Sequence, residues 1–475
     1  MGTKKIAIVC DFDGTLVKVD SLKEAAVRCV LSSPKDFLHA IFALLTKGRL
    51  DFKLRLRNHY AQDYNNCADK TVLSYLEHTS QNHDIYIFSG CPETELKRYV
   101  TQILRDKKVT FKGSTDVNFI GPVKARAITK IQADHIIYIG NSKDDIPCWN
   151  MADEKLFAGT PREWVQLKKS TNHKIEKLTT KKPPGIYHYL KQIRVYQWIK
   201  NTLVFAPLIL SANLDPTAWI STIFAFFFMS FVASGTYIIN DIKDLDKDRQ
   251  HPRKQSRPIA GGNIDPGVAL ILSISLIFTG ISGGFMINPL TGVAICSYAT
   301  LTLLYSFLLK YKVAINFIAL SILFCIRVIV GGFASSVTVT DVFLAFCLLV
   351  FSSLAVMKRV SDLLQNLESQ NYKGYIATDI SVLTNIGVGL AVSSFILLLH
   401  YVIDSFSEDF NKAIAMGILP VYLYWVSNCW ITTSRGEMTD DPIVHSLTNW
   451  KSQLSISIML MLFLFAHTAK GFIVD

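Results

Sequence analysis

Closely spaced cysteine pairs are absent from this chain of 475 residues, although it contains nine cysteines. Because no Cys-x-x-Cys pair occurs, the sequence argues against a disulfide framework or a zinc site and predicts reduced thiols. The N-terminus also lacks an apolar run long enough for a signal peptide, so we expect the first part of the chain to stay in the cytosol. No segment matches a nucleic-acid-binding motif, and the net charge of +11 fits a membrane protein with basic cytoplasmic loops.

Hydrophobic residues make up half of the chain and are unevenly distributed. The first 180 residues resemble a soluble protein, whereas apolar runs of membrane-spanning length recur from Trp198 onward. We predict nine transmembrane helices, at about 199–213, 216–239, 266–286, 288–308, 313–333, 341–357, 380–402, 411–432 and 453–473. The sequence thus predicts an N-terminal α/β domain over residues 1–176, a linker over 177–189 and an all-α membrane domain over 190–475.

Positive charge is concentrated in the loops on one side of the predicted membrane domain. Thirteen lysines and arginines fall in the even-numbered connections between spans, whereas only Lys412 falls in the others. Because basic loops stay in the cytoplasm, we expect the even-numbered connections and the N-terminal domain on the cytosolic side. The sequence therefore predicts a multi-pass protein of the inner (cytoplasmic) membrane.

The most informative segment is the aspartate loop, residues 240–262, which follows the second predicted span. Asp241, Asp244 and Asp248 are spaced i, i+3, i+7, so one helical face would present all three carboxylates. Such a face can hold a divalent cation, which in turn can hold a pyrophosphate. Five basic residues follow that could bind further phosphate oxygens: Arg249, His251, Arg253, Lys254 and Arg257. A solvated charged loop is the alternative, but acids and bases are largely segregated along this segment.

Further polar residues are expected near membrane level on the cytoplasmic side. They are Gln197, Lys200, Asn201, Tyr305, Lys310, Lys358, Arg359, Asp362, Lys373 and Asp379. Lys200 could instead be a snorkelling lysine beside Asn201, which would cap the helix. Arg327 lies inside the fifth predicted span, where an ionisable group is costly, so it is either functional or paired with a carboxylate from another helix. These residues predict a polar cavity that opens to the cytosol.

The aspartate loop resembles the first aspartate motif of the UbiA superfamily of intramembrane prenyltransferases. Its continuation, Arg-x-His-Pro-x-Lys-x-x-Arg-Pro-Ile-Ala, is similar more narrowly to polyprenyl-phosphate (decaprenyl-phosphate) phosphoribosyltransferases. Other segments that resemble this branch are residues 194–207, Tyr305-Ser306 with Lys310, Lys358-Arg359, and Gly-Glu-Met-Thr-Asp-Asp-Pro at 436–442. The resemblance covers essentially all of 190–475, and nine spans agree with it.

The resemblance implies a divalent cation in the membrane domain. Asp241, Asp244 and Asp248 would bind Mg²⁺ (or Mn²⁺), and the cation would bind the diphosphate of phosphoribosyl pyrophosphate. The sequence departs from the superfamily after the sixth span, where the usual second carboxylate motif is reduced to Asp362 and Asp379.

The resemblance also implies a set of substrate-binding residues and a lipid acceptor, polyprenyl phosphate. The set is Gln197, Lys200, Asn201, Asn240, Arg249, His251, Lys254, Arg257, Tyr305, Lys310, Arg327, Lys358 and Arg359. Within it, Lys254 and Arg257 are candidates for the ribose 5-phosphate, and Lys358 and Arg359 are candidates for the acceptor phosphate. The hydrophobic faces of the helices would hold the isoprenoid tail.

In the N-terminal domain, an apolar run within residues 4–10 predicts a buried strand that ends at Asp11-Phe12-Asp13-Gly14. Two carboxylates at the carboxyl end of a strand suit phosphoryl transfer, because Asp11 can attack phosphorus and Asp13 can protonate the leaving oxygen. Asp-x-Asp-Gly alone could also be a calcium loop or a turn.

This segment resembles the first motif of haloacid dehalogenase (HAD) superfamily phosphatases, and further motifs follow in order. Ser89 is similar to the Ser/Thr that holds phosphate, and Lys124 to the lysine that steadies the nucleophile. Asp145 is similar to an acidic metal ligand, whereas Asn141 stands where the superfamily usually has Asp. The resemblance implies a Rossmann-like fold with catalytic Asp11, Asp13, Ser89 and Lys124, and Mg²⁺ (or Mn²⁺) on Asp11, Asp13 and Asp145.

Apolar runs at 85–88 and 136–139 predict two more strands of this domain, which lead to Ser89 and Asn141. Between the first two strands, residues 17–84 have helical apolar spacing. We interpret them as a helical cap over the site, although ordinary core helices would give the same spacing.

The two resemblances imply a bifunctional enzyme that makes polyprenyl-phosphoryl ribose. The membrane domain would transfer 5-phosphoribose, and the tethered N-terminal domain would remove the 5-phosphate from a lipid that cannot leave the bilayer. An aromatic prenyltransferase that uses a prenyl diphosphate is an alternative, but the basic residues through Arg257 favour two phosphate-bearing substrates. A transporter with a regulatory soluble domain is disfavoured because the charged clusters gather at one membrane face. The sequence predicts no oligomeric state.

Overall fold

The computed structural model describes residues 5–105, 108–171, 173–365, 374–406, 409–438 and 441–468. The chain divides into a first unit, Met1–Ile193 with Tyr237–Ser273, and a second unit, Arg194–Thr236 with Ile274–Asp475. The aspartate loop, which the sequence assigns to the membrane domain, therefore belongs to the same unit as the N-terminal residues. Lys373 and residues 439–440 of the 436–442 motif lie outside the described residues.

A six-stranded parallel sheet forms the centre of the first unit. Its strands are β1 (Ile6–Asp11), β2 (Asp84–Pro92), β3 (Val109–Ser114), β4 (His135–Gly140), β5 (Glu154–Gly159) and β6 (Glu176–Thr180). Their order is β3-β2-β1-β4-β5-β6, so the order reverses direction beside β1. The three predicted strands are confirmed, and β6 occupies the start of the segment predicted as a linker.

β1 lies in the middle of the sheet, and five of its six residues are buried, as expected for an apolar strand covered on both faces. In register, Asp11 at the end of β1 pairs with Phe88 of β2. Because β1, β2 and β4 run parallel, Asp11, Ser89 and Asn141 come to the same carboxyl edge of the sheet. This edge lies at the reversal of strand order, where open α/β sheets usually bind ligands.

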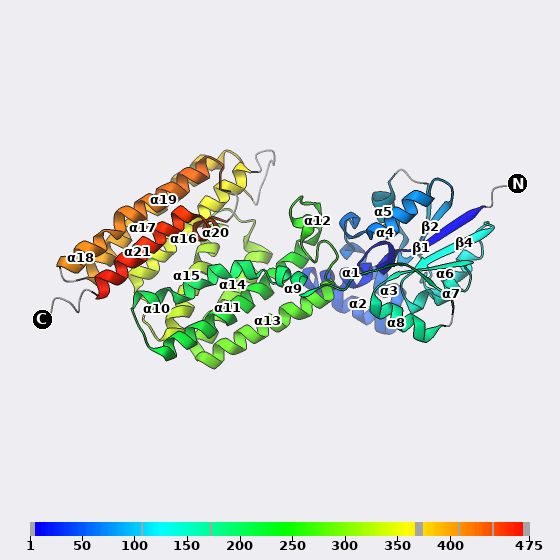
Figure 1. Cartoon of the computed structure of the whole chain (residues 1–475), viewed down its shortest axis with the longest axis horizontal. Helices are drawn as coiled ribbons and strands as arrows, with labels where there is room; N and C mark the ends of the chain where they lie inside the picture. The colour runs from blue at the N-terminus through cyan, green and yellow to red at the C-terminus, as the bar shows by residue number, and fades with distance from the viewer. Residues whose placement is uncertain are drawn as a thin grey trace. The chain divides into compact units, whose positions relative to one another are not determined.

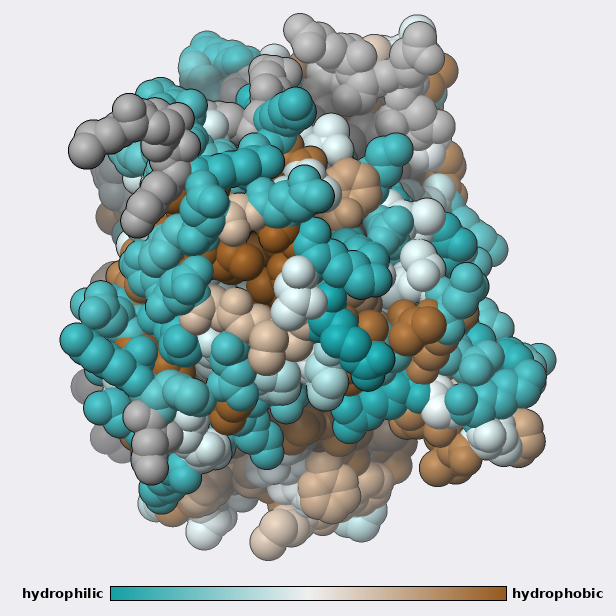
Figure 2. All heavy atoms as spheres, turned by 90° about the vertical axis from the view of Figure 1, so that its right-hand side faces the viewer, coloured by the Kyte–Doolittle hydropathy of each residue, from teal (hydrophilic) through white to brown (hydrophobic). Residues whose placement is uncertain are grey.

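Helices fill the connections between the strands of the first unit. Those between β1 and β2 are α1 (Ser21–Ser32), α2 (Pro34–Thr46), α3 (Arg49–Arg55) and α4 (Lys70–Thr79). The later connections contain α5 (Glu93–Leu104), α6 (Gly121–Ile128), α7 (Ile146–Trp149) and α8 (Pro161–Ser170), and α9 (Ile186–Gln192) follows the last strand. Figure 2 shows a face of this unit that is mostly hydrophilic, as expected for a domain in water.

The aspartate loop is built from short elements. α11 (Pro216–Lys243) ends in it, α12 (Leu245–Gln250) and a 3₁₀ turn (Lys254–Ser256) follow, and α13 (Pro266–Ile287) comes after it. Asp241 lies in the last turn of α11 and Asp248 lies in α12, but Asp244 separates the two helices with φ −91° and ψ 13°. The single helical face expected for the three carboxylates is therefore interrupted at Asp244.

The second unit is all-α. Its other helices are α10 (Ala206–Leu210), α14 (Pro289–Leu304), α15 (Ile315–Ser335), α16 (Asp341–Leu364), α17 (Asp379–Ser405), α18 (Asp409–Met416), α19 (Ile418–Ser434), α20 (Pro442–Thr448) and α21 (Trp450–Thr468). α16 packs against α15 and α17, and α19 packs against α17 and α21 (Figure 1). Apolar residues of these helices form the main hydrophobic core of the unit.

Within the described ranges, seven helices are long and apolar enough to cross a membrane. They are Pro216–Lys243, Pro266–Ile287, Pro289–Leu309, Ile315–Ser335, Asp341–Leu364, Asp379–Ser405 and Asp409–Ser434. The prediction of a multi-pass membrane protein is confirmed, but the count of nine is not. The first predicted span is a 3₁₀ segment, Val195–Phe205, followed by the five-residue α10, whose first turn contains Pro207. Proline fits a helix start but would break a continuous span.

A close approach between two segments positions the polar residues of the second unit. A Cβ on Gly331 of α15 would lie 1.9 Å from the carbonyl oxygen of Val204. Glycine therefore allows α15 to pack on the 3₁₀ segment that carries Lys200 and Asn201. Trp198 fixes the same segment to α11 by donating its Nε1–H to Ser234 Oγ at 2.9 Å.

Candidate functional site

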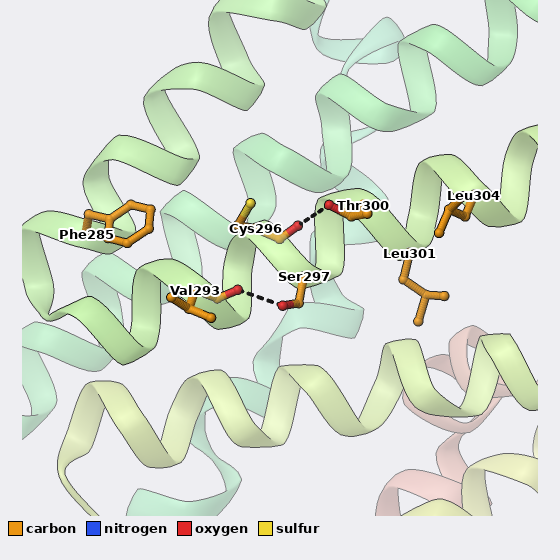
Figure 3. Close-up of a pocket in the computed structure, with 7 residues that line it drawn as sticks. All are labelled: Phe285, Val293, Cys296, Ser297, Thr300, Leu301 and Leu304. Carbon is orange, nitrogen blue, oxygen red and sulfur yellow. Dashed lines mark hydrogen bonds between the residues drawn. The ribbon is translucent and has the colours of Figure 1, made fainter.

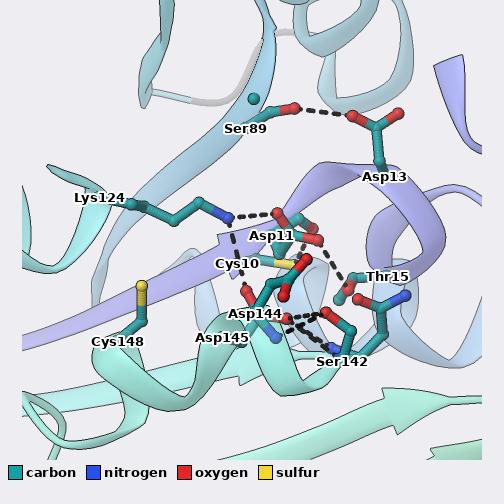
Figure 4. Close-up of polar contacts among 12 residues, drawn as sticks. Cys10, Asp11, Asp13, Thr15, Ser89, Lys124, Ser142, Asp144, Asp145 and Cys148 are labelled. Atoms are coloured by element: carbon teal, nitrogen blue, oxygen red, sulfur yellow. Dashed lines mark hydrogen bonds and ion pairs between the residues drawn. The ribbon is translucent and has the colours of Figure 1, made fainter. Parts of the chain in front are cut away.

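Three buried charged side chains meet at the carboxyl edge of the sheet (Figure 4). Lys124 of α6 reaches Asp11 at the end of β1, with Nζ 2.6 Å from Oδ1. The same ammonium lies 3.5 Å from Asp145 Oδ1. Thr15 donates its hydroxyl to the other oxygen of Asp11 at 3.2 Å. Lys124 thus holds two carboxylates from different loops together.

Asp13 is turned toward Ser89 rather than toward Lys124 (Figure 4). Ser89 donates its hydroxyl to Asp13 Oδ2 at 2.9 Å, and the N–H of Ser21, the first residue of α1, donates to Oδ1 at 2.8 Å. Ser89 Oγ also accepts the N–H of Cys91 at 3.0 Å. Asp11 and Asp13 therefore have different partners although only one residue separates them.

The loop after β4 is organised around Asp145. Its Oδ2 accepts the N–H groups of Asn141 at 3.1 Å and Ser142 at 3.2 Å. The Asn141 side chain donates to Glu163 at 3.3 Å. Gly14 permits this packing, because its φ is +72° and a Cβ there would lie 2.2 Å from Asn141 Nδ2. Asn141 is thus held beside the loop that carries Asp11 and Asp13.

Burial changes the protonation of both N-terminal carboxylates. It raises the pKa of Asp11 to about 7, although the Lys124 ammonium opposes the shift. Burial also raises the pKa of Asp13, and the Asp20 carboxylate adds to the shift. A raised pKa favours the protonated carboxyl group, which suits Asp13 to donating a proton.

In the aspartate loop, Arg257 joins two of the three carboxylates. Its Nη1 lies 3.0 Å from Asp241 Oδ1 and 2.5 Å from Asp248 Oδ2. Gln192 of α9 donates to the other oxygen of Asp241 at 3.0 Å. Both carboxylates are buried, and burial raises the pKa of Asp248. Oxygens of two carboxylates therefore converge on one cationic nitrogen.

Arg249, which the sequence offers as a substrate ligand, is directed into the N-terminal residues and is 2% exposed. Its Nη1 and Nη2 donate to the two carboxylate oxygens of Glu24 in α1, at 2.7 and 2.8 Å. Its guanidinium lies over Tyr64, 4.7 Å from the ring centroid. Burial alone would lower the pKa of Arg249, but the Glu24 carboxylate, together with Cys67 and Tyr64, raises it. These donors are used in the fold and do not face a ligand.

The other predicted residues of the aspartate loop lie nearer the surface. His251 is exposed, and its Nδ1 accepts the N–H groups of Arg253 at 3.2 Å and Lys254 at 3.4 Å. Lys254 and Asn240 are half-buried. His251 therefore caps the turn after α12, whereas Arg257 contacts two of the carboxylates.

Two lysines share one carboxylate in the second unit. Lys200 Nζ, from the 3₁₀ segment, lies 3.0 Å from Asp441 Oδ2, and Lys358 Nζ, from α16, lies 2.5 Å from the same atom. Asp441 also caps α20, since its other oxygen accepts the N–H of Ile443 at 3.2 Å. Two ammonium groups on one carboxylate leave a net positive charge, which favours an anionic ligand.

Arg359, the neighbour of Lys358 in α16, is buried beside two other residues that the sequence singles out. Its Nη2 donates to the hydroxyl of Tyr305 at 2.7 Å, and its Nη1 donates to Asp362 at 3.0 Å. The structure therefore brings Tyr305, Arg359 and Asp362 together.

Arg327 of α15 is buried and donates hydrogen bonds to neutral groups. Its Nε donates to Asn201 Oδ1 at 2.9 Å, its Nη1 to the Leu323 carbonyl at 2.6 Å and its Nη2 to the Tyr298 hydroxyl at 2.9 Å. Its guanidinium also lies 4.8 Å from the centroid of the Tyr298 ring. These hydrogen bonds hold Asn201 in place, so Arg327 shapes the 3₁₀ segment that carries Lys200.

The structure also places Gln197 and Lys310, two further predicted residues. Gln197 is half-buried in the 3₁₀ segment. Lys310 is buried after a π-helical turn at Tyr305–Leu309, and its ammonium lies 5.3 Å from the ring centroid of Tyr311.

The predicted metal ligands do not form three-residue clusters. In the part of the chain that the structure describes, no group of three or more His, Cys, Asp or Glu side chains is arranged to hold a metal ion. In the N-terminal set, Asp13 faces Ser89 while Asp11 and Asp145 share Lys124. In the aspartate loop, Asp241 and Asp248 converge on Arg257 in a similar way.

Residues 201–438 match the UbiA prenyltransferase family. The chain belongs to this family. The match begins within the 3₁₀ segment, at the residue after Lys200, and it includes the aspartate loop. It confirms the family that the sequence predicts for the membrane half.

Several known proteins are similar to this UbiA family member, and their matches cover different parts of the chain. The chain is 27% identical over 468 residues to uncharacterized protein y4nM of Sinorhizobium fredii, which covers 94% of this chain and 89% of that protein. It is 32% identical over 181 residues to decaprenyl-phosphate phosphoribosyltransferase of Mycobacterium tuberculosis, over 37% of this chain and 59% of that protein. A solved UbiA homolog from Archaeoglobus fulgidus bound to GPP and Mg²⁺ has a TM-score of 0.46 and 16% identity, over 58% of this chain and 99% of that chain.

An apolar pocket of about 360 Å³ lies on the UbiA helices α13 and α14 (Figure 3). It is lined by Phe285, Val293, Cys296, Ser297, Thr300, Leu301 and Leu304. The hydroxyls of Ser297 and Thr300 donate to carbonyls of their own helix, at 2.9 and 3.0 Å, so these residues add little polarity to the lining. A hydrocarbon chain of any membrane lipid fits such a surface.

Several residues that complete these sites are not among those predicted from the sequence. Asp441 lies in the 436–442 motif, which the sequence singles out without assigning a role to Asp441. Glu24 and Gln192 belong to no motif in the sequence, because their partners in the aspartate loop are distant along the chain. Glu24 and Arg249, for example, are 225 residues apart. Tyr138 donates to Asp145 at 2.6 Å and reads in the sequence as an ordinary strand residue.

Proposed function

We propose that this chain transfers 5-phosphoribose from phosphoribosyl pyrophosphate to a polyprenyl phosphate and then removes the 5-phosphate, which gives polyprenyl-phosphoryl ribose. The observation that carries the proposal is the net positive cluster of Lys200, Asp441 and Lys358, which adds to the cations of the aspartate loop. Two phosphate-bearing substrates need two cationic groups, whereas a prenyl diphosphate with a neutral aromatic acceptor needs one. The relative named decaprenyl-phosphate phosphoribosyltransferase supports the same choice of substrates.

In the transfer step, one bond forms and one breaks. An oxygen of the polyprenyl phosphate attacks the anomeric carbon of the ribose, and the bond from that carbon to pyrophosphate breaks, with the electron pair leaving on pyrophosphate. We assign Lys358 and Arg359 to the acceptor phosphate, and Lys254 and Arg257 to the ribose 5-phosphate. The guanidinium and ammonium groups of each pair would bind the phosphate that is assigned to it.

Asp241 and Asp248 fit a divalent cation such as Mg²⁺, because their oxygens already converge on Arg257 Nη1. When bound, the cation would neutralise charge on the diphosphate leaving group. We include Asp244 as a third ligand on the strength of the resemblance alone. Binding of the cation would release Arg257 from at least one carboxylate, which frees its guanidinium for a substrate phosphate.

The N-terminal site supports removal of the 5-phosphate by HAD-type chemistry. The Asp11 carboxylate would attack phosphorus, the ester bond to ribose would break, and Asp13 would protonate the ribose oxygen. Water would then hydrolyse the aspartyl phosphate and release inorganic phosphate. Ser89 and Lys124 would hold phosphate oxygens, and Mg²⁺ would be held by Asp11 and Asp145, which share Lys124, with Asp13. We place both sites on the cytosolic face of the inner membrane, as the loop charges indicate.

The test is product analysis with the purified full-length protein in lipid nanodiscs. With Mg²⁺, phosphoribosyl pyrophosphate and polyprenyl phosphate, mass spectrometry should find a lipid-linked ribose. A parallel reaction with a prenyl diphosphate and an aromatic acceptor should give no product. A prenylated aromatic product without any lipid-linked ribose would overturn the proposal in favour of the aromatic prenyltransferase.

A further inference from the structure

We propose that helix α1 holds the aspartate loop in its working shape, and that Arg249 is a positioning residue of the transferase that acts through Glu24. The inference rests on the proposed function of the loop. It gives the N-terminal residues a role in transfer that is separate from their role in phosphate removal.

The aspartate loop needs support because its central helix is very short. α12 has six residues, too few for a helix to be stable by itself in water. It nevertheless carries Asp248, and its residues Leu245, Asp248 and Arg249 are buried. The position of Asp248 is therefore set by the surface on which α12 packs.

That surface includes α1, and the two helices are joined by two reciprocal ion pairs. Arg249 of α12 binds both oxygens of Glu24, as described above. Arg28 of α1 binds both oxygens of Asp246, with Nη1 3.1 Å from Oδ1 and Nη2 in contact with Oδ2. The N–H of Gln62 also donates to Asp246 at 3.0 Å. Each helix thus supplies one arginine and one carboxylate, which fixes their register.

The chain on both sides of Arg257 is fixed to the same N-terminal residues. Asn66 donates to the carbonyl of Arg249 at 2.7 Å, and the Cys67 thiol donates to the carbonyl of Ala260 at 3.2 Å. Arg249 Nε also donates to Ala260 at 3.2 Å. Gly262 has φ +68°, and a Cβ there would lie 3.1 Å from Val19 Cγ1. Residues 249–262, with Arg257 between the two anchors, are therefore shaped by contacts with residues 19–67.

The Glu24 pair is the contact most sensitive to change. Both side chains are almost completely buried, and a buried guanidinium that loses its carboxylate is strongly unfavourable. We expect its loss to loosen α12 and to displace Asp248 and Arg257, because small displacements of positioning groups can lower rates by about 100-fold.

The experiment uses the full-length protein in nanodiscs and the variants Glu24→Gln and Asp246→Asn. Hydrogen exchange of residues 244–262 and Mn²⁺ affinity by electron paramagnetic resonance need no turnover, so they test the inference even if the proposed reaction fails. We expect faster exchange in this segment, weaker Mn²⁺ binding and a higher KM for phosphoribosyl pyrophosphate, by about 10- to 100-fold for Glu24→Gln. The KM for the lipid acceptor should not change. The Arg249→Lys variant should retain part of the wild-type protection from exchange and part of the wild-type Mn²⁺ affinity.

Glu77→Gln is the matched control, since it makes the same chemical change at an exposed position of α4 and leaves α1 intact. It should leave exchange, Mn²⁺ binding and donor KM at wild-type values. Unchanged exchange and Mn²⁺ binding in Glu24→Gln would overturn the inference. Equal acceleration of exchange across the sheet and the loop in both Glu24→Gln and the milder Asp246→Asn would also overturn it, because the contacts would then be merely structural.

A separate observation on α2 carries a second inference, which concerns the membrane surface. Leu38, Phe42 and Leu45 are spaced i, i+4, i+7 on one face of α2 and are 67, 66 and 78% exposed. Three exposed basic residues flank this face: Lys35, Lys47 and Arg49. We propose that this face lies in the headgroup region of the membrane, with the basic residues on anionic lipids.

The membrane is the occupant to expect, because the same unit contains the ends of two spanning helices. α11 ends at Lys243 and α13 begins at Pro266. At the start of α13, a Cβ on Gly267 would lie 3.9 Å from Val27 Cγ2 of α1, the helix that directly precedes α2. α2 is therefore tethered close to the plane in which the lipid substrate lies.

A photo-crosslinking residue at position 42 of the full-length protein in nanodiscs tests this inference without any turnover. Phe42→benzoylphenylalanine should form lipid adducts, more in phosphatidylglycerol than in phosphatidylcholine. Val165→benzoylphenylalanine, at an exposed position of α8, should form few in either lipid. Equal lipid labelling at the two positions, or crosslinks from position 42 to a second copy of the chain, would overturn the inference.

Discussion

The sheet site and the aspartate loop lie in the same unit but are assembled in different ways. At the sheet edge, hydrogen-bonded strands deliver Asp11 and Ser89, and a helix beside them delivers Lys124. In the aspartate loop, Asp248 lies on a six-residue helix that is joined to α1 by ion pairs. The sheet site therefore depends on the strands of one sheet and a helix beside them, whereas the loop depends on ion pairs with residues 225 positions away in the chain. Residues of a short carboxylate motif can thus be held in place by residues that are distant in sequence.

The largest effect is expected from Asp11→Asn, which should affect the sheet site alone. The variant removes the nucleophile, so release of inorganic phosphate should fall by about 10⁴-fold. Transfer of 5-phosphoribose to lipid should continue at the wild-type rate, because Asp11 makes no described contact with the aspartate loop. A phosphate-release assay beside lipid mass spectrometry checks both results. Parallel loss of both steps would show that the two sites are not separable.

Asp248→Asn is the corresponding change in the aspartate loop. It leaves Arg257 with one carboxylate and removes a proposed cation ligand, so transfer should fall by about 100-fold or more. Higher Mg²⁺ concentration should restore part of the rate. Asp215→Asn, at an exposed position of the second unit, is the control and should transfer normally. An Asp248→Asn variant with normal transfer and normal Mg²⁺ dependence would refute the assignment of this carboxylate.

A smaller effect is expected from Lys358→Met in the second unit. Asp441 would retain Lys200, so the fold should persist while the cluster loses its excess positive charge. We expect the KM for polyprenyl phosphate to rise by about 10-fold, with little change in the KM for phosphoribosyl pyrophosphate. Steady-state kinetics with each substrate varied in turn gives the measurement. Lys312→Met, at an exposed position, should match the wild type.

The smallest effect is expected from Gly331→Ala, which tests how the 3₁₀ segment is held. The added Cβ would meet the Val204 carbonyl, so the free energy of unfolding should fall by about 1–3 kcal/mol, visible as a lower thermal midpoint. Gly389→Ala is the matched control, since a Cβ at Gly389 meets nothing within 4 Å. It should raise stability slightly, by up to about 1 kcal/mol, because alanine favours the helix. Equal midpoints for the two variants would contradict the close approach.

The sheet site could be largely predicted because local patterns determine it. Apolar runs end at Asp11, Ser89 and Asn141, and parallel strands bring such ends together. The role of Arg249 could not be predicted, since in sequence it is one of several bases after the carboxylates, like Lys254. Its partner Glu24 lies on a helix whose position only the fold determines.

The membrane half shows a second limit of prediction. The apolar composition predicted a span at 199–213, but hydropathy does not distinguish a 3₁₀ segment from an α-helix. The structure has a 3₁₀ segment there, followed by a new helix whose first turn contains Pro207. Arg359 and Asp362 were expected within one turn of each other, and the structure places both in α16 with a hydrogen bond between them. The pairing of Asp441 could not be predicted from the sequence, because its lysine partners come from two other segments.

The most direct test of the central claim uses phosphoribosyl pyrophosphate labelled with ¹⁴C in the ribose and with ³²P in the 5-phosphate. The full-length protein in nanodiscs, supplied with Mg²⁺ and polyprenyl phosphate, should give a lipid that contains ¹⁴C but no ³²P, and the ³²P should appear as inorganic phosphate. The Asp11→Asn variant should give a lipid with both labels in equal amounts. A lipid fraction without ¹⁴C in both proteins would contradict phosphoribosyl transfer, and a wild-type lipid that keeps its ³²P would contradict the role of the N-terminal site.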